Sequence, residues 1–144
     1  MDNNLKREII LDNYQNPRHF GNTDDPKYIK VNMNSTSCID ELNILLKVND
    51  NDVIEDIMFN GEACAISTSS ASIMTQLLLG KSKTEAMEII DNFLNMIYEE
   101  EYDEDKLDEA LVYDDIKKQP NRKKCATLSW LGAKKALEGD TDGK

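Results

Sequence analysis

Residues 41–62 read ELNILLKVNDNDVIEDIMFNGE, and this stretch decides the fold class. Its first part alternates apolar and polar side chains, which is the period of a strand with one buried face. The apolar positions are Leu42, Ile44, Leu46 and Val48. The turn-forming run Asn-Asp-Asn-Asp at 49–52 leads into a second apolar stretch at 53–60. We therefore predict a β-hairpin here, and a third strand over 28–33.

Helical patterns flank this small sheet on both sides. An apolar face predicts one helix over residues 3–14, before the sheet. After the sheet we predict a helix rich in small side chains over 65–79, then a helix opened by a Ser82 capping box. Pro120 is expected to stop the chain before a last helix over 124–137. An N-terminal helix, a small three-stranded antiparallel sheet and several packed helices make an α+β fold.

The length of 144 residues predicts a single domain over residues 1–138, with a frayed C-terminal tail over 139–144. Residues 99–115 carry ten acidic side chains and a single lysine. We interpret this acidic segment as a solvated helix or a mobile loop, because a run of like charges is usually exposed to water.

Charge and hydropathy exclude several classes of function. The formal net charge of −11 argues against a protein that binds duplex nucleic acid, since such binding depends on neutralising phosphates. The same charge disfavours an anionic membrane surface, and no apolar run approaches the roughly 20 residues that span a bilayer. Residues 1–6 lack the pattern of a signal peptide, so we expect a soluble, cytoplasmic protein.

The three cysteines are the most informative chemical groups in the sequence. Cys38 comes just before the first clear strand, and Cys64 lies between the second strand and the small-residue helix. Cys125 is expected to open the last helix, directly after three basic residues. We therefore expect all three thiols at element boundaries, with two near helix N-termini, where partial positive charge favours the thiolate.

Three thiolates and one carboxylate are a suitable ligand set for tetrahedral zinc, and Asp40 lies two residues after Cys38. The chain has no CxxC pair, so the spacing alone leaves open that the thiols are separate buried or surface groups. His19, in a proline-containing loop, is more typical of a surface or capping residue than of a ligand. The serine-rich run at 67–72 is more typical of close helix packing than of a nucleophile.

The chain resembles the SufU branch of the iron–sulfur assembly proteins, within the superfamily that also contains the IscU scaffolds, over about residues 5–137. The resemblance is carried by five segments in order: REIILDNYQNPRHFG at 7–21, CID at 38–40, GEACAIS at 61–67, SASIMT at 70–75 and CATLSW at 125–130. Ile39 stands where the family has the glycine of a Cys-Gly-Asp motif. Lys124 stands where IscU-type scaffolds have a histidine, and the acidic segment resembles the SufU insertion.

The resemblance implies both a site and an activity. Cys38, Asp40, Cys64 and Cys125 would bind a zinc ion, and Cys38 would be the catalytic residue that accepts sulfane sulfur from the persulfide of a SufS-type cysteine desulfurase. Downstream iron–sulfur assembly proteins would be further partners. Two alternatives remain open: a scaffold on which an iron–sulfur cluster is assembled, because the same four residues could ligate iron, and a purely structural zinc protein.

Overall fold

The computed structural model describes residues 2–34 and 40–139. Its elements are α1 (Asn3–Gln15), β1 (Ile29–Asn34), β2 (Glu41–Val48), β3 (Ile54–Glu62), α2 (Ala65–Leu78), α3 (Lys83–Ile97), the 3-10 helices η1 (Glu104–Lys106), η2 (Asp108–Tyr113) and η3 (Ile116–Lys118), and α4 (Pro120–Leu137). This order confirms the predicted α+β fold. Among the described residues, no helix is long and apolar enough to cross a membrane.

The sheet is antiparallel with the strand order β1-β2-β3. Val31 pairs with Ile44, and Ile44 pairs with Phe59, so the buried side chains of the three strands lie in one row. The predicted hairpin turn is closed by the side chain of Asn49, which accepts hydrogen bonds from the backbone N–H of Asn51 and of Val53. Such local side-chain acceptors are the reason Asn and Asp favour turns.

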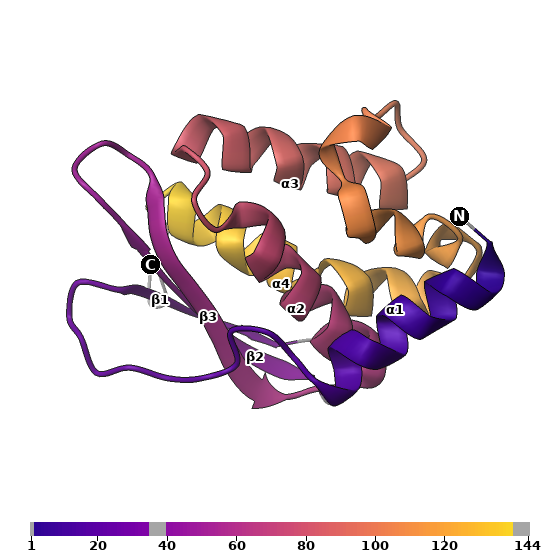
Figure 1. Cartoon of the computed structure of the whole chain (residues 1–144), viewed down its shortest axis with the longest axis horizontal. Coiled ribbons are helices and arrows are strands. Elements are labelled where there is room, and N and C mark those ends of the chain that lie inside the picture. Colours follow the sequence, from indigo (N-terminus) through magenta and orange to yellow (C-terminus); the bar gives the residue numbers. More distant parts are fainter. Residues whose placement is uncertain (1, 35–39, 140–144) are drawn as a thin grey trace.

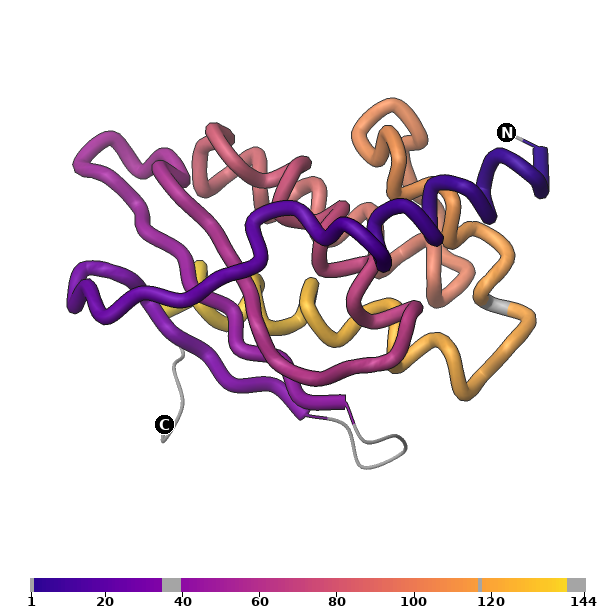
Figure 2. Tube along the Cα trace, turned by 60° about the horizontal axis from the view of Figure 1, so that its bottom comes forward, coloured from indigo at the N-terminus to yellow at the C-terminus, as the bar shows by residue number. Residues whose placement is uncertain are grey.

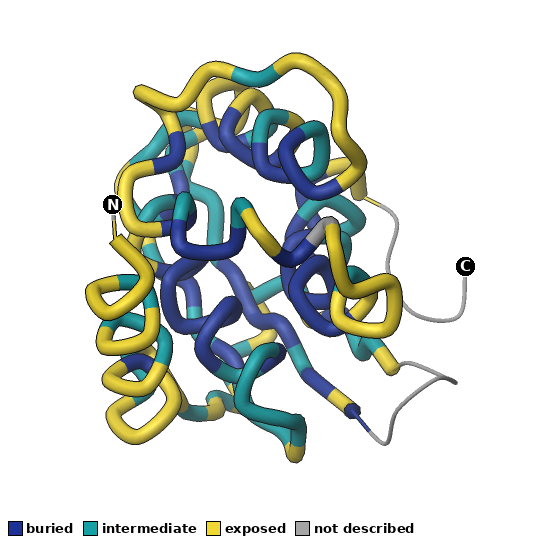
Figure 3. The backbone as a smooth tube through the Cα atoms, turned by 90° about the vertical axis from the view of Figure 1, so that its right-hand side faces the viewer, coloured by how far each residue is buried: buried dark blue, intermediate teal, exposed yellow. Residues whose placement is uncertain are grey.

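Helices α2 and α4 pack against one face of the sheet, and α1 and α3 lie outside them (Figure 1). α1 packs on α2, and α3 packs on α4. Figure 3 shows the result: the inner helices are largely buried, whereas α1 is exposed along its outer side. The two inner helices therefore connect the sheet to the rest of the chain, and both carry candidate site residues.

Aromatic packing fixes α3 and α4 in the core. The ring of Trp130 stacks on Phe93 with centroids 4.1 Å apart and an interplanar angle of 8°. The indole N–H of Trp130 donates to Ser70 Oγ at 2.9 Å, and the Ser70 hydroxyl donates to the backbone carbonyl of Ala126 at 2.6 Å. Trp130 and Ser70 are fully buried. These bonds tie α2 to α4 and satisfy polar groups that burial would otherwise leave unpaired.

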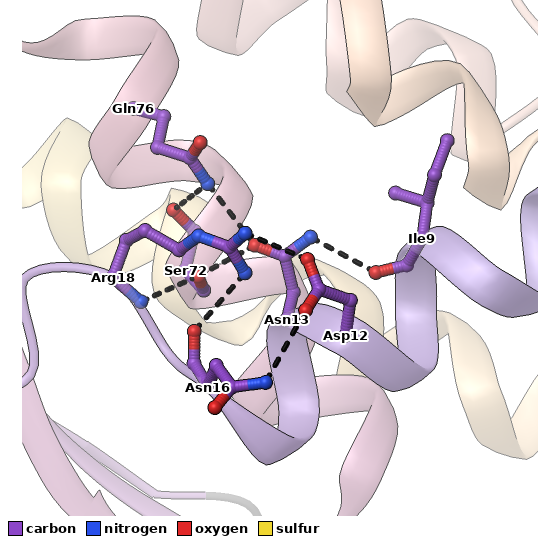
Figure 4. A network of polar contacts seen from close by, with 7 residues as sticks. All are labelled: Ile9, Asp12, Asn13, Asn16, Arg18, Ser72 and Gln76. Atoms are coloured by element: carbon purple, nitrogen blue, oxygen red, sulfur yellow. Dashed lines mark hydrogen bonds and ion pairs between the residues drawn. The ribbon is translucent and has the colours of Figure 1, made fainter.

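A second polar network attaches α1 to α2 (Figure 4). The side-chain carbonyl of Asn13 accepts from the Ser72 hydroxyl at 2.7 Å and from Gln76 Nε2 at 3.0 Å. The backbone N–H of Arg18 also donates to Ser72 Oγ, while its guanidinium pairs with Asp12 at 2.6 Å. The serine-rich run thus serves close helix packing at Ser70 and Ser72, as predicted.

The acidic segment is not simply a solvated helix or a mobile loop, as the charge pattern suggested. It forms η1 and η2. Three of its residues are packed in the core with no exposed surface: Leu107, Ala110 and Tyr113. It lies beside α1 in space, although the two are far apart in sequence (Figure 2). Lys6 of α1 contacts Asp114 at 2.5 Å, which raises the pKa of the lysine. The acidic side chains face water, whereas the apolar residues between them are buried.

Helix α4 begins earlier than predicted. Pro120 is its first residue and not a stop. Proline suits this position because the first helical N–H has no partner within the helix. The predicted C-terminal tail lies largely outside the described residues, since residues 140–144 are not among them.

Candidate metal centre

The antiparallel register of the hairpin brings Asp40 and Cys64 together. Glu41, the first residue of β2, pairs with Glu62, the last residue of β3, so the residue before β2 lies close to the residues after β3. Gly61 makes this close approach possible: its φ is +125°, and a Cβ there would lie 2.1 Å from the carbonyl oxygen of Glu41. Any other residue would force the two strands apart.

Cys64 is the N-cap of α2, as its predicted position at the strand–helix boundary suggested. Its backbone is extended, and its Sγ accepts a hydrogen bond from the backbone N–H of Ser67 at 3.5 Å. The unpaired N–H groups of a first helical turn carry partial positive charge. The sulfur of Cys64 thus lies at the N-terminus of α2, and cysteine binds metals through its sulfur.

Cys125 does not lie at a helix boundary, and that prediction was wrong. It is the sixth residue of α4, because the helix starts at Pro120. Its Sγ lies 3.7 Å from the backbone carbonyl of Asn121, one turn earlier, and the residue is only 5% exposed. The thiol reaches the site because α4 packs against α2.

Asp40, Cys64 and Cys125 converge at one point. One ligand atom from each lies within 4.8 Å of the others. Asp40 and Cys125 are buried, and Cys64 is half-buried. A tetrahedral zinc ion with bonds of about 2.0–2.3 Å needs ligand atoms roughly 3.5 Å apart, so small side-chain rotations would suffice. Two thiols and a carboxylate from three distant segments form a donor set that fits zinc.

Hydrogen bonds hold the carboxylate of Asp40 in place. The backbone N–H of Cys64 donates to Asp40 Oδ1 at 2.7 Å, and the hydroxyl of Ser67 donates to Oδ2. Sequence reasoning placed Ser67 among the packing serines and missed this contact. The position of Ser67 three residues after the N-cap could have indicated this contact, because the side chain at that position faces back toward the cap.

Tyr113 lies in the core, near enough to Cys64 for the two groups to interact electrostatically. Its hydroxyl is hydrogen-bonded to Ser69 and is fully buried. Burial raises the pKa of this phenol, the hydrogen bond to Ser69 opposes the rise, and the nearby Cys64 adds to it. The phenol therefore stays neutral beside the thiols and adds no charge to the site.

The remaining candidates fall elsewhere. Cys38, and with it Ile39, lies outside the described residues. His19 is exposed, and its Nδ1 lies 2.9 Å from the hydroxyl of Thr75, so it contacts α2 and is not part of the group around Cys64. Its backbone has a φ of 58°, a left-handed conformation within the loop. The surface interpretation of His19 is confirmed.

A surface cavity of about 470 Å³ opens between α1, the start of α2 and the start of α4. Its lining is partly apolar and partly polar or charged, and includes Ile10, Ala65, Ile66, Val112, Ile116, Arg7, Arg122, Asp115 and Gln119. Ala65 and Ile66 directly follow Cys64, and Arg122 precedes Cys125 by less than one helical turn. The candidate site thus adjoins an open depression in the surface.

Comparison with known proteins places this site in context. The model of the NifU-like N-terminal domain matches residues 5–136. The zinc-dependent sulfurtransferase SufU of Bacillus subtilis (strain 168) is 39% identical over 140 residues, covering 96% of this chain and 93% of that protein. The iron–sulfur cluster assembly scaffold protein IscU of Streptococcus pyogenes serotype M1 is 38% identical, covering 94% of this chain and 84% of its own.

Solved structures agree with these similarities. The crystal structure of FiSufU, a protein of the SUF system of Fervidobacterium islandicum AW-1, superposes with a TM-score of 0.85. It is 33% identical, and the match covers 90% of this chain and 94% of that one. A NifU-like protein from Brucella abortus has a TM-score of 0.82 at 18% identity, which shows a shared fold.

Proposed function

Because the chain belongs to the family of NifU-like N-terminal domains, we propose that it acts in iron–sulfur cluster assembly as a zinc-dependent sulfur acceptor. In this role it takes sulfur from the persulfide of a SufS-type cysteine desulfurase onto Cys38. The observation that carries the proposal is the convergence of Asp40, Cys64 and Cys125 within 4.8 Å. The similarity to a zinc-dependent sulfurtransferase over nearly the whole chain supports it.

Four residues would hold the zinc ion: Cys38, Asp40, Cys64 and Cys125. Cys38 is two residues from Asp40, and an extended chain spans at most about 3.6 Å per residue. The short stretch of chain between them therefore allows the Cys38 thiol to join the group. When bound, zinc keeps its cysteine ligands deprotonated and links them to one another.

The four proposed ligands have two roles: three anchor the ion to the fold, and one accepts sulfur. Cys64 caps α2, Cys125 lies inside α4, and Asp40 is hydrogen-bonded to the first turn of α2. These three are fixed by the packed core, so replacing one of them disturbs the structure. Cys38 lies between β1 and β2 in the sequence, outside the described residues, and is the proposed acceptor.

The transfer is a thiol–disulfide exchange. The thiolate of Cys38 attacks the outer sulfur of the desulfurase persulfide, and a new S–S bond forms on Cys38. The S–S bond of the desulfurase breaks, and its cysteine departs as a thiolate with the bonding electron pair. One sulfur atom moves with no net oxidation or reduction, so the step needs no further reactant. Downstream iron–sulfur assembly proteins then take the sulfur from Cys38.

Mass spectrometry after reaction with a desulfurase tests the acceptor role. The protein, incubated with a SufS-type desulfurase and free cysteine, should carry one added sulfur on the peptide that contains Cys38. Cys38→Ala should abolish both the added sulfur and the stimulation of desulfurase turnover, while its circular dichroism spectrum stays native. Stimulation retained by Cys38→Ala would remove Cys38 from the mechanism.

A cluster scaffold is the second candidate function. The similarity to IscU of Streptococcus pyogenes favours it, and thiolates with a carboxylate also suit iron. The two functions differ in a simple observable, because an iron–sulfur cluster absorbs visible light and a zinc site does not. Protein reconstituted with iron and sulfide should remain colourless after desalting if zinc is its metal, whereas a stable brown protein would favour the scaffold. With either function, we propose that the protein works in the cytoplasm beside its desulfurase.

A further inference from the structure

Ser67 contacts two of the candidate ligands at once. Its hydroxyl donates to Asp40 Oδ2 and lies 3.5 Å from Cys64 Sγ. Its backbone N–H donates to the same sulfur. The residue has no exposed surface, so these contacts form away from water, where hydrogen bonds to charged groups are strong.

The carboxylate of Asp40 is bonded through both of its oxygens. Oδ1 accepts the backbone N–H of Cys64 at 2.7 Å, and Oδ2 accepts the hydroxyl of Ser67. Each bond comes from the first turn of α2, so the plane of the carboxylate is fixed relative to Cys64. Oδ2 also lies 3.5 Å from Cys64 Sγ, so the oxygen that Ser67 contacts faces a second candidate ligand.

We propose that Ser67 is a positioning residue of the metal centre, whose hydroxyl fixes Asp40 as a ligand that offers one oxygen. This inference rests on the zinc site of the proposed function. Without the Ser67 hydroxyl, the carboxylate of Asp40 can rotate. It can then bind the ion through both oxygens, or turn away from the ion. Partners that orient a metal ligand in this way typically change metal affinity by about 10–100-fold when removed.

Zinc affinity, measured by competition with a chromophoric chelator, tests the proposal. Ser67→Ala should weaken zinc binding by about 10–100-fold. Ser69→Ala is the matched control, because Ser69 lies on the same helix, is equally buried and bonds to Tyr113 instead of to Asp40. Its zinc affinity should equal that of the wild type. Equal affinity for the wild type and Ser67→Ala would overturn the proposal.

A second pair of variants separates the hydroxyl from its packing. Ser67→Thr keeps a hydroxyl and Ser67→Val has nearly the same shape without one, so only the valine variant should lose affinity. The absorption spectrum of the Co²⁺-substituted protein should match the wild type in the threonine variant and change in the valine variant. Identical spectra and affinities in the two variants would contradict the proposal, even if Ser67→Ala fails to fold.

A double-mutant cycle tests whether Ser67 acts through Asp40. Once Asp40→Ala has removed the carboxylate, Ser67→Ala should cause no further loss of zinc affinity. Additive losses would show that Ser67 supports the fold alone and would overturn the positioning role. A wild-type protein that binds neither Zn²⁺ nor Co²⁺ would instead refute the zinc site itself, so the two failures are distinguishable.

Discussion

The backbone N–H of Cys64 donates a hydrogen bond to the carboxylate of Asp40 at 2.7 Å, and this bond joins the end of the hairpin to the start of α2. It forms because the β2–β3 register places Glu41 opposite Glu62. Two of the four candidate ligands are therefore oriented by the backbone itself, before any metal binds. The site is built from the sheet ends and two core helices, so binding at the site should stabilise the whole fold.

Removal of metal is therefore expected to lower thermal stability. If zinc binds only the folded chain, it raises the free energy of unfolding by about 2.7 kcal/mol when free zinc is 100-fold above the dissociation constant. This corresponds to a rise of roughly 5–10 °C in Tm. A chelator should reverse this rise in the wild type and have no effect on Cys125→Ala, which lacks a ligand. Melting followed by circular dichroism measures both, and a chelator-independent wild-type Tm would contradict the coupling.

Ser129 offers a stabilising substitution. Its hydroxyl is fully buried, and its Oγ has no hydrogen-bond partner among the described residues. A buried polar group without a partner costs free energy, and alanine in a helix does not. Ser129→Ala should raise the free energy of unfolding by about 0.5–1 kcal/mol, measured by urea denaturation.

Ser70→Ala is the matched control, with the opposite sign. The Ser70 hydroxyl accepts from Trp130 and donates to the carbonyl of Ala126, so its loss leaves the buried indole N–H without this partner and removes the bond from α2 to the Ala126 carbonyl. We expect a loss of about 1–3 kcal/mol, together with a changed fluorescence of Trp130, which is the single tryptophan of the chain. If both serines gave the same change, hydrogen bonding would not explain either.

Gly132 is required by the packing of α4 on the sheet. A Cβ at this position would lie 2.8 Å from Met33 Cγ and 2.9 Å from Ile44 Cγ1. Alanine is normally the better helix former by about 1 kcal/mol, but overpacking a core costs about 1–3 kcal/mol. We expect Gly132→Ala to be destabilising by about 1 kcal/mol in urea denaturation, because Ile44 lies in the fully buried centre of the sheet. A stabilised Gly132→Ala variant would contradict this expectation, because it would mean that the side chains of Met33 and Ile44 move aside at little cost.

Alkaline pH should weaken the fold through Tyr28. Its hydroxyl donates to Asp56, and this hydrogen bond raises the pKa of the phenol from 10.0 to about 12. The folded chain therefore keeps a proton that the unfolded chain loses, so the contribution is complete below pH 10.0 and disappears as pH rises through about 12. Tyr28→Phe should therefore lose less stability as the pH rises. The difference from the wild type should be at most about 1 kcal/mol, because the hydrogen-bonded pair is accessible to solvent.

Asp56→Asn should flatten the same fall in stability, since it removes the charge that holds the proton on Tyr28. Denaturation at a series of alkaline pH values measures the slope. Unchanged slopes in both variants would show that another group governs alkaline unfolding.

The sheet and the main helices could be predicted because each has a clear period or boundary signal. The alternation over 42–48 and the capping serine at Ser82 gave β2 and the start of α3, and the structure confirms both. The acidic segment was harder, because its charges dominate the pattern while single apolar residues such as Tyr113 pack into the core. The true start of α4 was missed because Pro120 is compatible with both a stop and a first turn.

The candidate site was predictable in composition but not in arrangement. The cysteines and Asp40 could be picked out by their chemistry and by resemblance, whereas their convergence depends on how α4 packs on α2, which no local pattern contains. The role of Ser67 is likewise a product of tertiary contact, because its neighbours Ser69 and Ser70 look the same in sequence. Cys38 lies outside the described residues, so its place in the site stays a prediction.

The metal content of protein purified without oxygen tests the central claim most directly. Elemental analysis and an absorption spectrum of the same sample should show about one zinc per chain and no visible absorption, and Asp40→Ala and Cys64→Ala should retain much less zinc. Iron with sulfide and visible absorption in the wild type, or no metal at all, would contradict the account of a zinc-dependent sulfur acceptor.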